Sequence, residues 1–266
     1  MRHKLKTTAQ NALRKGPVLD FPPFERLYGN ETSDFIIVCD HASNAIPECY
    51  HNLGIDAEQM KRHIAYDIGV AEVTRHLNDI LNVPAILSCF SRLLIDPNRG
   101  CDDPTLIMKI SDGALISGNI FIDDAERAYR IKTFYEPYHE AIDAAIEETL
   151  AVGKTPALVS IHSFTRTWKG QDRPWHITFL WDQDTRLAKP MFDAFAQQDN
   201  TIVGENVPYK GSLHGDCMHR HGTLRGLPHA LIEIRQDLIA TPEGQREWAE
   251  RIAGVLEGLS PEQFYS

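Results

Sequence analysis

Short, mostly apolar runs followed by turn residues recur along the chain and predict the strands of a sheet. Each run is five residues long and rich in Val, Ile, Leu, Phe and Ala. Such runs are typical of strands with little exposure to water. The predicted strands are Phe35–Cys39, Ala85–Cys89, Ala157–Ile161, Ile177–Trp181 and Ala230–Ile234.

Helical patterns lie between these runs. From residue 68 to 81 the apolar residues Val70, Val73, Leu77 and Leu81 recur at spacings of three and four, which places them on one helix face. A longer pattern continues from residue 124 to about 150, where Pro137 should break or restart the helix. Further helices are predicted at 185–197 and 241–259.

Alternation of strands and helices predicts an α/β fold: a three-layer sandwich with a mixed, largely parallel sheet flanked by helices. We expect a short N-terminal arm at residues 1–18 and a single catalytic domain at 19–266, because no linker or repeat divides the rest of the chain. The connection from residue 91 to 123 is rich in Gly, Pro, Asn and Asp and is interpreted as a functional loop.

Composition and charge narrow the range of possible partners and cellular locations. The chain has 266 residues and a formal net charge of -10, which argues against a nucleic-acid partner because phosphate binding needs a surplus of Lys and Arg. The five cysteines are scattered and form no CxxC pair, so a reducing compartment fits best. The basic N-terminus lacks an apolar core and no window resembles a membrane span. We expect a cytoplasmic protein with a small-molecule partner and no membrane association.

Two predicted strands end in histidine, at His41 in FIIVCDHASN and at His162 in PALVSIHSF. Parallel neighbours would bring both imidazoles to one rim of the sheet, whereas a lone histidine there is commonly an exposed turn residue. Hydrolytic zinc sites take three ligands from His and carboxylates and leave one position for water. Asp40, beside His41, could orient an imidazole.

A carboxylate is needed near the two histidines, and Asp67 in RHIAYDIG is the candidate. It lies at the start of the predicted helix, where a helix-capping role is the alternative. His63, four residues earlier, is a rival ligand if the helix begins sooner.

Glu233 and Arg235 interrupt the apolar strand in LPHALIEIRQDLI and project to the same side. Charged groups are seldom buried unless they are paired or functional. Glu233 is therefore either an ion-pair partner of Arg235 or the acid/base of a metal hydrolase.

Basic clusters elsewhere suit an anionic substrate. In SRLLIDPNRG the Arg92 and Arg99 side chains could bind a carboxylate, with an Asp96–Arg99 salt bridge as the alternative. In LHGDCMHRHG the residues His214, His219 and His221 fit a mobile lid or substrate clamp at least as well as a metal site. No GxGxxG, Walker, GxSxG or HExxH motif is present, which excludes the usual dinucleotide, NTPase, serine-hydrolase and zincin interpretations.

Taken together and in order, CDHASNAIP, HIAYDIG, SRLLIDPNR, SIHSF, RPWHI and GLPHALIEIRQDLI resemble the N-formylglutamate amidohydrolase family from about residue 19 to 257. That family is similar to the zinc carboxypeptidase and cell-wall amidase superfamily, with a phosphorylase/hydrolase-like sandwich. One departure is that carboxypeptidases take an acid ligand three residues after the first histidine, where this chain has Asn44.

The resemblance implies hydrolysis of the amide bond of an N-acyl amino acid such as N-formyl-L-glutamate, a small anionic substrate, with zinc or another divalent transition metal as cofactor. Alternatives are an amidase acting on a peptide or cell-wall stem peptide, and a binding module without chemistry; the oligomeric state, a homo-oligomer included, stays open. The resemblance implies His41, Asp67 and His162 as metal ligands and Glu233 as the catalytic acid/base. From the residues themselves we expect Arg235 to be the second catalytic residue and the substrate to be bound by Arg92, Asp96, Arg99, Asn44, Arg166, His176 and His221.

Overall fold

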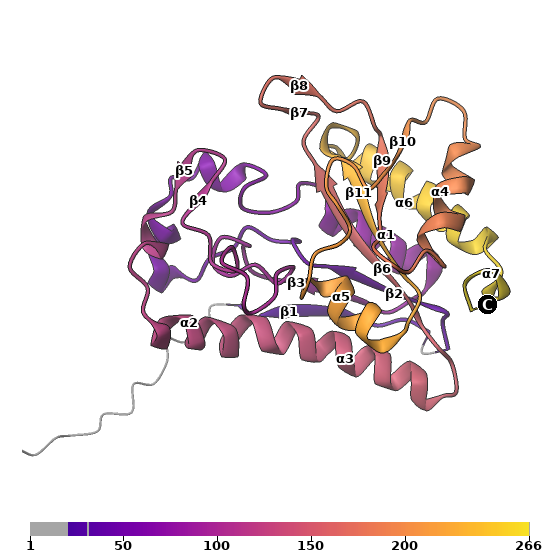
Figure 1. Ribbon diagram of the computed structural model, residues 1–266, viewed down its shortest axis with the longest axis horizontal. Helices are drawn as coiled ribbons and strands as arrows, with labels where there is room; N and C mark the ends of the chain where they lie inside the picture. Colours follow the sequence, from indigo (N-terminus) through magenta and orange to yellow (C-terminus); the bar gives the residue numbers. More distant parts are fainter. Residues whose placement is uncertain (1–20, 31, 266) are drawn as a thin grey trace, which may run out of the picture.

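The computed structural model describes residues 21–30 and 32–265, so the predicted arm at 1–18 lies outside the described residues. A seven-stranded sheet forms the centre of the fold (Figure 1). Its strands are β1 Phe24–Leu27, β2 Phe35–Cys39, β3 Ala85–Ser88, β6 Ala157–Phe164, β9 Ile177–Leu180, β10 Val203–Glu205 and β11 His229–Arg235. Their spatial order is β1-β3-β2-β6-β11-β9-β10.

The sheet is mixed and mostly parallel, as predicted. The central strands β3, β2, β6 and β11 run parallel, β1 and β9 pair antiparallel with β3 and β11, and β10 runs parallel to β9. All five predicted strands are present, and β6 continues three residues beyond its predicted end. The edge strands β1 and β10 were not predicted because they are short and only partly apolar. Two small hairpins lie outside the sheet, β4 Ile110–Ser111 with β5 Ala114–Leu115 and β7 Thr167–Trp168 with β8 Gln171–Asp172.

Helices cover both faces of the sheet, which gives the three layers seen in Figure 1. The helices are α1 Val70–Leu81, α2 Asp124–Arg130, α3 Glu136–Ala151, α4 Ala188–Ala196, α5 Cys217–His221, α6 Pro242–Gly258 and α7 Pro261–Tyr265. A π-helical turn, Ile131–Tyr135, joins α2 to α3 and restarts the helix. Pro137 lies in the first turn of α3, directly after this π-helical turn. None of the described helices is both long and apolar enough to cross a membrane.

The strand side chains alternate between two apolar cores. In β2, Ile36 and Val38 pack toward α3, whereas Ile37 and Cys39 pack toward α1 and α6. A sheet buried on both faces presents its polar groups at the strand ends, and in parallel strands the carboxyl ends gather at one rim. The fold thus places the residues that follow β2 and those near the ends of β6 and β11 together.

The loop from residue 91 to 123 is held by a buried arginine at the end of α2. Arg130 is 1% exposed, and its Nη1 donates to the carbonyl of Leu94 at 2.9 Å and to Asn119 Oδ1 at 2.7 Å. The Asn119 side chain in turn donates to the carbonyls of Leu93 and Met108. Arg130 thus donates hydrogen bonds that backbone N–H groups would supply in a regular helix or strand.

Substitution Arg130→Leu should lower the free energy of unfolding by about 3 kcal/mol, because it leaves buried carbonyl and amide oxygens without a donor. The matched change Lys132→Leu, at an exposed position in the same helical run, should change it by less than about 0.5 kcal/mol. Urea unfolding of both variants measures the difference. Equal midpoints would show that Arg130 does not hold the loop.

Candidate metal-dependent active site

Three acid and imidazole side chains come together at the carboxyl rim of the sheet. His41 follows β2 directly, His162 lies near the end of β6, and Glu233 occupies the neighbouring position in β11, paired in register with His162. All three are buried. The rings of His41 and His162 lie edge to face with centroids 4.8 Å apart. The predicted convergence of the two histidines on one rim is thereby confirmed.

Asp67 completes this group from the turn before α1. Its Oδ2 lies 3.4 Å from His41 Nδ1 and 2.9 Å from His162 Nδ1, and it accepts a 3.2 Å hydrogen bond from the backbone N–H of Ser163. Asp67 does not cap the helix, because α1 begins at Val70 and the N-cap residue is Gly69, which makes no side-chain cap bond. The helix-capping alternative is therefore wrong.

The ligand-capable atoms of His41, Asp67 and His162 all lie within 4.8 Å of one another, so these residues could hold a metal ion. His63, the rival ligand, does not belong to this group; its ring packs edge to face against Trp168, and its Nε2 lies 3.6 Å from Asp112. Two imidazoles and one carboxylate form a ligand set that hydrolytic zinc sites use.

The far nitrogen of each histidine faces a second carboxylate. His41 Nε2 lies 2.7 Å from Asp96 Oδ1, and His162 Nε2 lies 2.9 Å from Asp40 Oδ2. With a metal bound, a carboxylate in this position would keep the proton on the far nitrogen, so that the near nitrogen, Nδ1, would offer its lone pair to the ion. Asp40 thus orients an imidazole, although the ring it contacts is that of His162 rather than of its neighbour His41.

Both orienting carboxylates are held in turn by buried donors. Asp40 accepts hydrogen bonds from the hydroxyls of Tyr138 and Ser160, each at 2.9 Å. Asp96 accepts from the guanidinium of Arg92 at 2.8 and 3.2 Å and from the backbone N–H of Asn98. The Arg92 Nη1 also lies 3.5 Å from Asp67. This network fixes the position of both imidazoles from behind.

The buried charges shift several pKa values. Burial alone would raise the pKa of Asp40, Asp67 and Asp96, but interactions with His162, His41 and Arg92 outweigh it and hold all three well below the usual range. Burial would lower the pKa of His162, but hydrogen bonds to Asp40 and Asp67 raise it to about 10. In the metal-free site the ionised carboxylates are therefore paired with the protonated His162 and with Arg92.

Glu233 differs from the other acids because it has little to stabilise its charge. It is 7% exposed, and its Oε2 has no hydrogen-bond partner among the described residues. Burial, opposed by the charge of His162, raises the pKa of Glu233 to about 8. Arg235 does not pair with it; the guanidinium binds Asp237 and the carbonyl of Pro174. The Glu233–Arg235 ion pair considered from the sequence is therefore absent.

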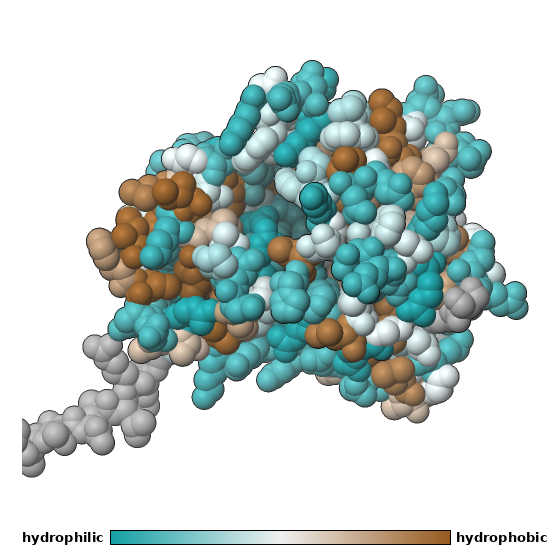
Figure 2. Space-filling model, in the orientation of Figure 1, coloured by the Kyte–Doolittle hydropathy of each residue, from teal (hydrophilic) through white to brown (hydrophobic). Residues whose placement is uncertain are grey.

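A cavity of about 480 Å³ opens onto this group. Figure 2 shows a hollow near the centre of this face of the molecule with mainly hydrophilic walls. The loop that follows β10 supplies one wall, and the loop before α2 supplies another. Side chains with polar or charged groups that line the cavity include His41, Asp67, Arg92, Asn98, Arg99, His162, Tyr209, Lys210, His214, Asp216, His219, His229 and Glu233.

Several residues expected to bind substrate lie elsewhere. Asn44 donates to the carbonyl of Met60 at 2.8 Å, and Asp96 is fully buried behind His41 and pairs with Arg92 rather than Arg99. Arg166 lies near Asp237 and its side chain is 66% exposed. These three residues do not line the cavity.

Two further histidines are also placed away from the cavity. His176 accepts a hydrogen bond from the backbone N–H of Ile202 and lines a separate surface depression. His221 is fully buried beside His139. Of the predicted substrate-binding residues, the cavity is lined by Arg92 and Arg99.

Sequence reasoning missed part of the cavity wall. Tyr209, Lys210 and Asp216 line it, and burial raises the pKa of Asp216 to about 7. They occur in the segment YKGSLHGD, whose only signal is its Gly and polar composition between two predicted elements. No periodicity shows which cleft such a loop faces.

Comparisons with known proteins identify the family of this chain and show the same fold. The sequence model of the N-formylglutamate amidohydrolase family matches residues 33–240. The crystal structure of gene product Atu2144 from Agrobacterium tumefaciens is 32% identical, with a TM-score of 0.85 over 90% of this chain and 94% of that chain. The N-formylglutamate amidohydrolase from Ralstonia eutropha JMP134 shares the fold at 20% identity, with a TM-score of 0.67 over 90% of this chain and 100% of that chain. No curated protein matches the chain.

The family match defines the class of protein: a hydrolase that acts on an amide bond. The chain belongs to the N-formylglutamate amidohydrolase family.

The raised pKa of Glu233 has a consequence for stability. A carboxyl whose pKa is about 8 in the folded state and 4.5 in the unfolded state keeps its proton in the folded protein after the unfolded chain has released it. The folded state therefore loses stability as the pH rises from about 4.5 to 8. In metal-free protein, Glu233→Gln should remove this loss.

The variant is expected to match the wild type near pH 4 and to be more stable at pH 9, by up to about 4 kcal/mol. Urea unfolding of both proteins across this range gives the comparison, with the exposed substitution Glu140→Gln as control. If the stability difference between wild type and Glu233→Gln did not change with pH, the carboxyl would not be desolvated as described.

Proposed function

We propose that this protein is a metal-dependent amidohydrolase that cleaves the amide bond of an N-acyl amino acid such as N-formyl-L-glutamate, releasing formate and the amino acid. The observation that carries the proposal is the convergence of His41, Asp67 and His162 beside an unpaired, buried Glu233 at the base of a cavity. Family membership supports the amide-hydrolysing chemistry.

The buried charges fit a divalent cation. Three carboxylates, Asp40, Asp67 and Asp96, are buried around the two histidines, and Arg92 contacts two of them. With neutral imidazoles this group lacks two positive charges, which a divalent ion would supply. An uncompensated buried charge is costly, so a divalent ion would take over the charge compensation that the proton on His162 supplies in the metal-free site.

The histidine donors also fit a borderline transition metal better than Mg²⁺ or Ca²⁺, which prefer oxygen ligands. His41 Nδ1, His162 Nδ1 and a carboxylate oxygen of Asp67 would hold the ion, and zinc is the first candidate. When bound, such an ion polarises a scissile carbonyl and acidifies a water molecule.

Glu233 is assigned the proton transfers. Its carboxyl lines the cavity from the strand position beside His162, and in the metal-free protein burial raises its pKa to about 8. We assign it to take a proton from the attacking water and to deliver it to the departing amine. Without that delivery the amine would leave as an unstable anion.

Cationic side chains in the cavity would recognise the carboxylates of the substrate. Arg99 and Lys210 line the cavity, and within the described residues neither makes an ion pair. Arg92 is already engaged by Asp96 and Asp67. Arg99 is therefore the best placed guanidinium to bind a carboxylate of the substrate. We place Arg235 outside this chemistry because Asp237 and backbone carbonyls occupy its donors.

Substitution Glu233→Gln should leave metal content unchanged and lower kcat about 10²- to 10⁴-fold, because the amide keeps the shape of the side chain but transfers no proton. Elemental analysis and an assay of formate release from N-formyl-L-glutamate measure the two quantities. Normal turnover in this variant would eliminate the acid/base assignment.

The same assay, with other N-acyl amino acids, small peptides and cell-wall stem peptides in parallel, tests the proposed substrate class. Wild-type protein loaded with zinc is expected to cleave N-acyl amino acids with the highest kcat/KM. Preference for a peptide would overturn the substrate assignment, and absence of hydrolysis with every metal tried would overturn the enzymatic one.

Substitution Arg99→Gln should raise KM for N-formyl-L-glutamate about 10- to 100-fold with a smaller change in kcat, since it removes a charged hydrogen bond to the substrate. The control Arg166→Gln, outside the cavity, should leave KM unchanged. Two analogues of N-formyl-L-glutamate each have one of the two carboxylates amidated. For the analogue that lacks the carboxylate bound by Arg99, Arg99→Gln should raise KM much less than it does for the parent substrate. Equal increases for both analogues would contradict a direct contact.

A further inference from the structure

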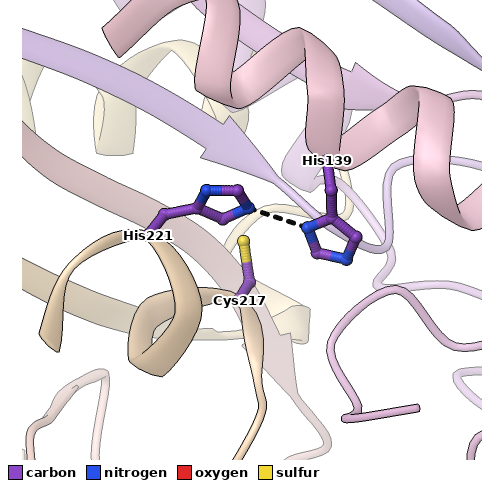
Figure 3. Close-up of side chains that lie close together, drawn as sticks. All are labelled: His139, Cys217 and His221. Carbon is purple, nitrogen blue, oxygen red and sulfur yellow. Dashed lines mark hydrogen bonds between the residues drawn. The ribbon is translucent and has the colours of Figure 1, made fainter. Parts of the chain in front are cut away.

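A second buried cluster of metal-ligand residues lies beside the active site. His139 of α3 and Cys217 and His221 of α5 point toward one another (Figure 3), and all three are fully buried. Their ligand-capable atoms lie within 4.8 Å of one another. His139 Nδ1 and His221 Nε2 face each other at 2.8 Å. None of these residues lines the cavity of the proposed active site.

The far nitrogen of His221 faces a carboxylate, as the histidines of the active site do. His221 Nδ1 lies 3.0 Å from Asp143 Oδ1, and Arg225 donates to the same oxygen at 2.9 Å. A proton held on Nδ1 by this carboxylate leaves the lone pair of Nε2 facing His139 Nδ1, with the Cys217 sulfur within 4.8 Å. The orientation is that of a preformed ligand.

The donor set of two imidazoles and one thiolate suits a thiophilic cation such as Zn²⁺ or Cu⁺. Zinc–nitrogen bonds are about 2.0–2.1 Å long, so two nitrogens on a tetrahedral ion lie about 3.3 Å apart. The rings need to separate by only about 0.5 Å from their present contact. Binding requires no redox step. The Cys217 thiol, which hydrogen-bonds to Asp40 and whose pKa burial raises well above its usual range, would release its proton to solvent as the metal–sulfur bond forms.

We propose that His139, Cys217 and His221 form a second metal site, structural in role and specific for a thiophilic ion. This site goes beyond the proposed function and does not depend on it. The ion would join α5 to α3 and so fix the loop that precedes α5, which carries the cavity residues Lys210 and Asp216. The backbone N–H of Cys217 already donates to Asn98, on the loop that carries Arg99.

Cobalt(II) substitution tests the site in the full chain, because a cobalt–thiolate bond gives a charge-transfer absorption that histidine and carboxylate ligands do not. Wild-type protein loaded with Co²⁺ should show this band. The variant His41→Ala/Asp67→Ala, which lacks two ligands of the proposed active site, should keep the band and retain one ion per chain. Absence of the band in folded wild-type protein would overturn the proposal whatever the variants do.

Two cysteine variants give the matched control. Cys217→Ser should lose the band and one ion per chain, whereas Cys101→Ser, at an exposed position, should lose neither. Competition with a Cu⁺ chelator under reducing conditions distinguishes the two candidate ions. A copper site should keep Cu⁺ in the presence of the chelator, whereas a zinc site should release Cu⁺ and take up Zn²⁺. A band that survives Cys217→Ser would place the sulfur ligand elsewhere and contradict the assignment.

Discussion

The arrangement of the site depends on one buried carboxylate, that of Asp67, which lies between the Nδ1 atoms of two histidines. A desolvated anion is stable only with a strong partner, and here the imidazoles and Arg92 supply it. The outer carboxylates Asp40 and Asp96 extend this alternation of acid and base on the far side of each ring. The side chains are thereby held in one geometry before any substrate enters.

Residues from different layers of the fold hold the outer carboxylates in place. Asp40 accepts hydrogen bonds from Tyr138 on α3 and from Ser160 on β6, so the helix layer and the sheet fix the same carboxylate. Arg92 donates to Asp96, and both residues lie on the loop that Arg130 holds by donating to the carbonyl of Leu94. Glu233 differs because no residue in the described part of the chain donates to its Oε2, and this leaves it available for proton transfer in the proposed mechanism.

The sequence predicted the sheet and the meeting of His41 with His162 because both follow from local pattern. An apolar run ending in a polar residue places that residue at a strand end, and parallel strands bring such ends together. Arg130 and Asn119 could not be found in this way, since their role is to satisfy irregular backbone. The same holds for Asp96, whose partners His41 and Arg92 are known only once the loop is folded.

Family resemblance supplied the choice between Asp67 and His63, which local pattern left open. Composition alone could not predict where His221 lies. Its Gly- and His-rich segment divides between two locations, the cavity wall and a buried cluster. His214 and His219 line the cavity, whereas His221, two residues further, turns toward α3. A helix that begins at Cys217 sets this division, and only the three-dimensional structure reveals where it points.

The central claim is that His41, Asp67 and His162 hold a divalent ion in front of Glu233. Anomalous diffraction from crystals of zinc-loaded protein, recorded on both sides of the zinc absorption edge, tests it most directly. The account predicts a peak within bonding distance of both Nδ1 atoms and an Asp67 carboxylate oxygen. A zinc peak on the cavity histidines His214, His219 or His229 instead, with Asp67 still bound directly to the two imidazoles, would contradict it.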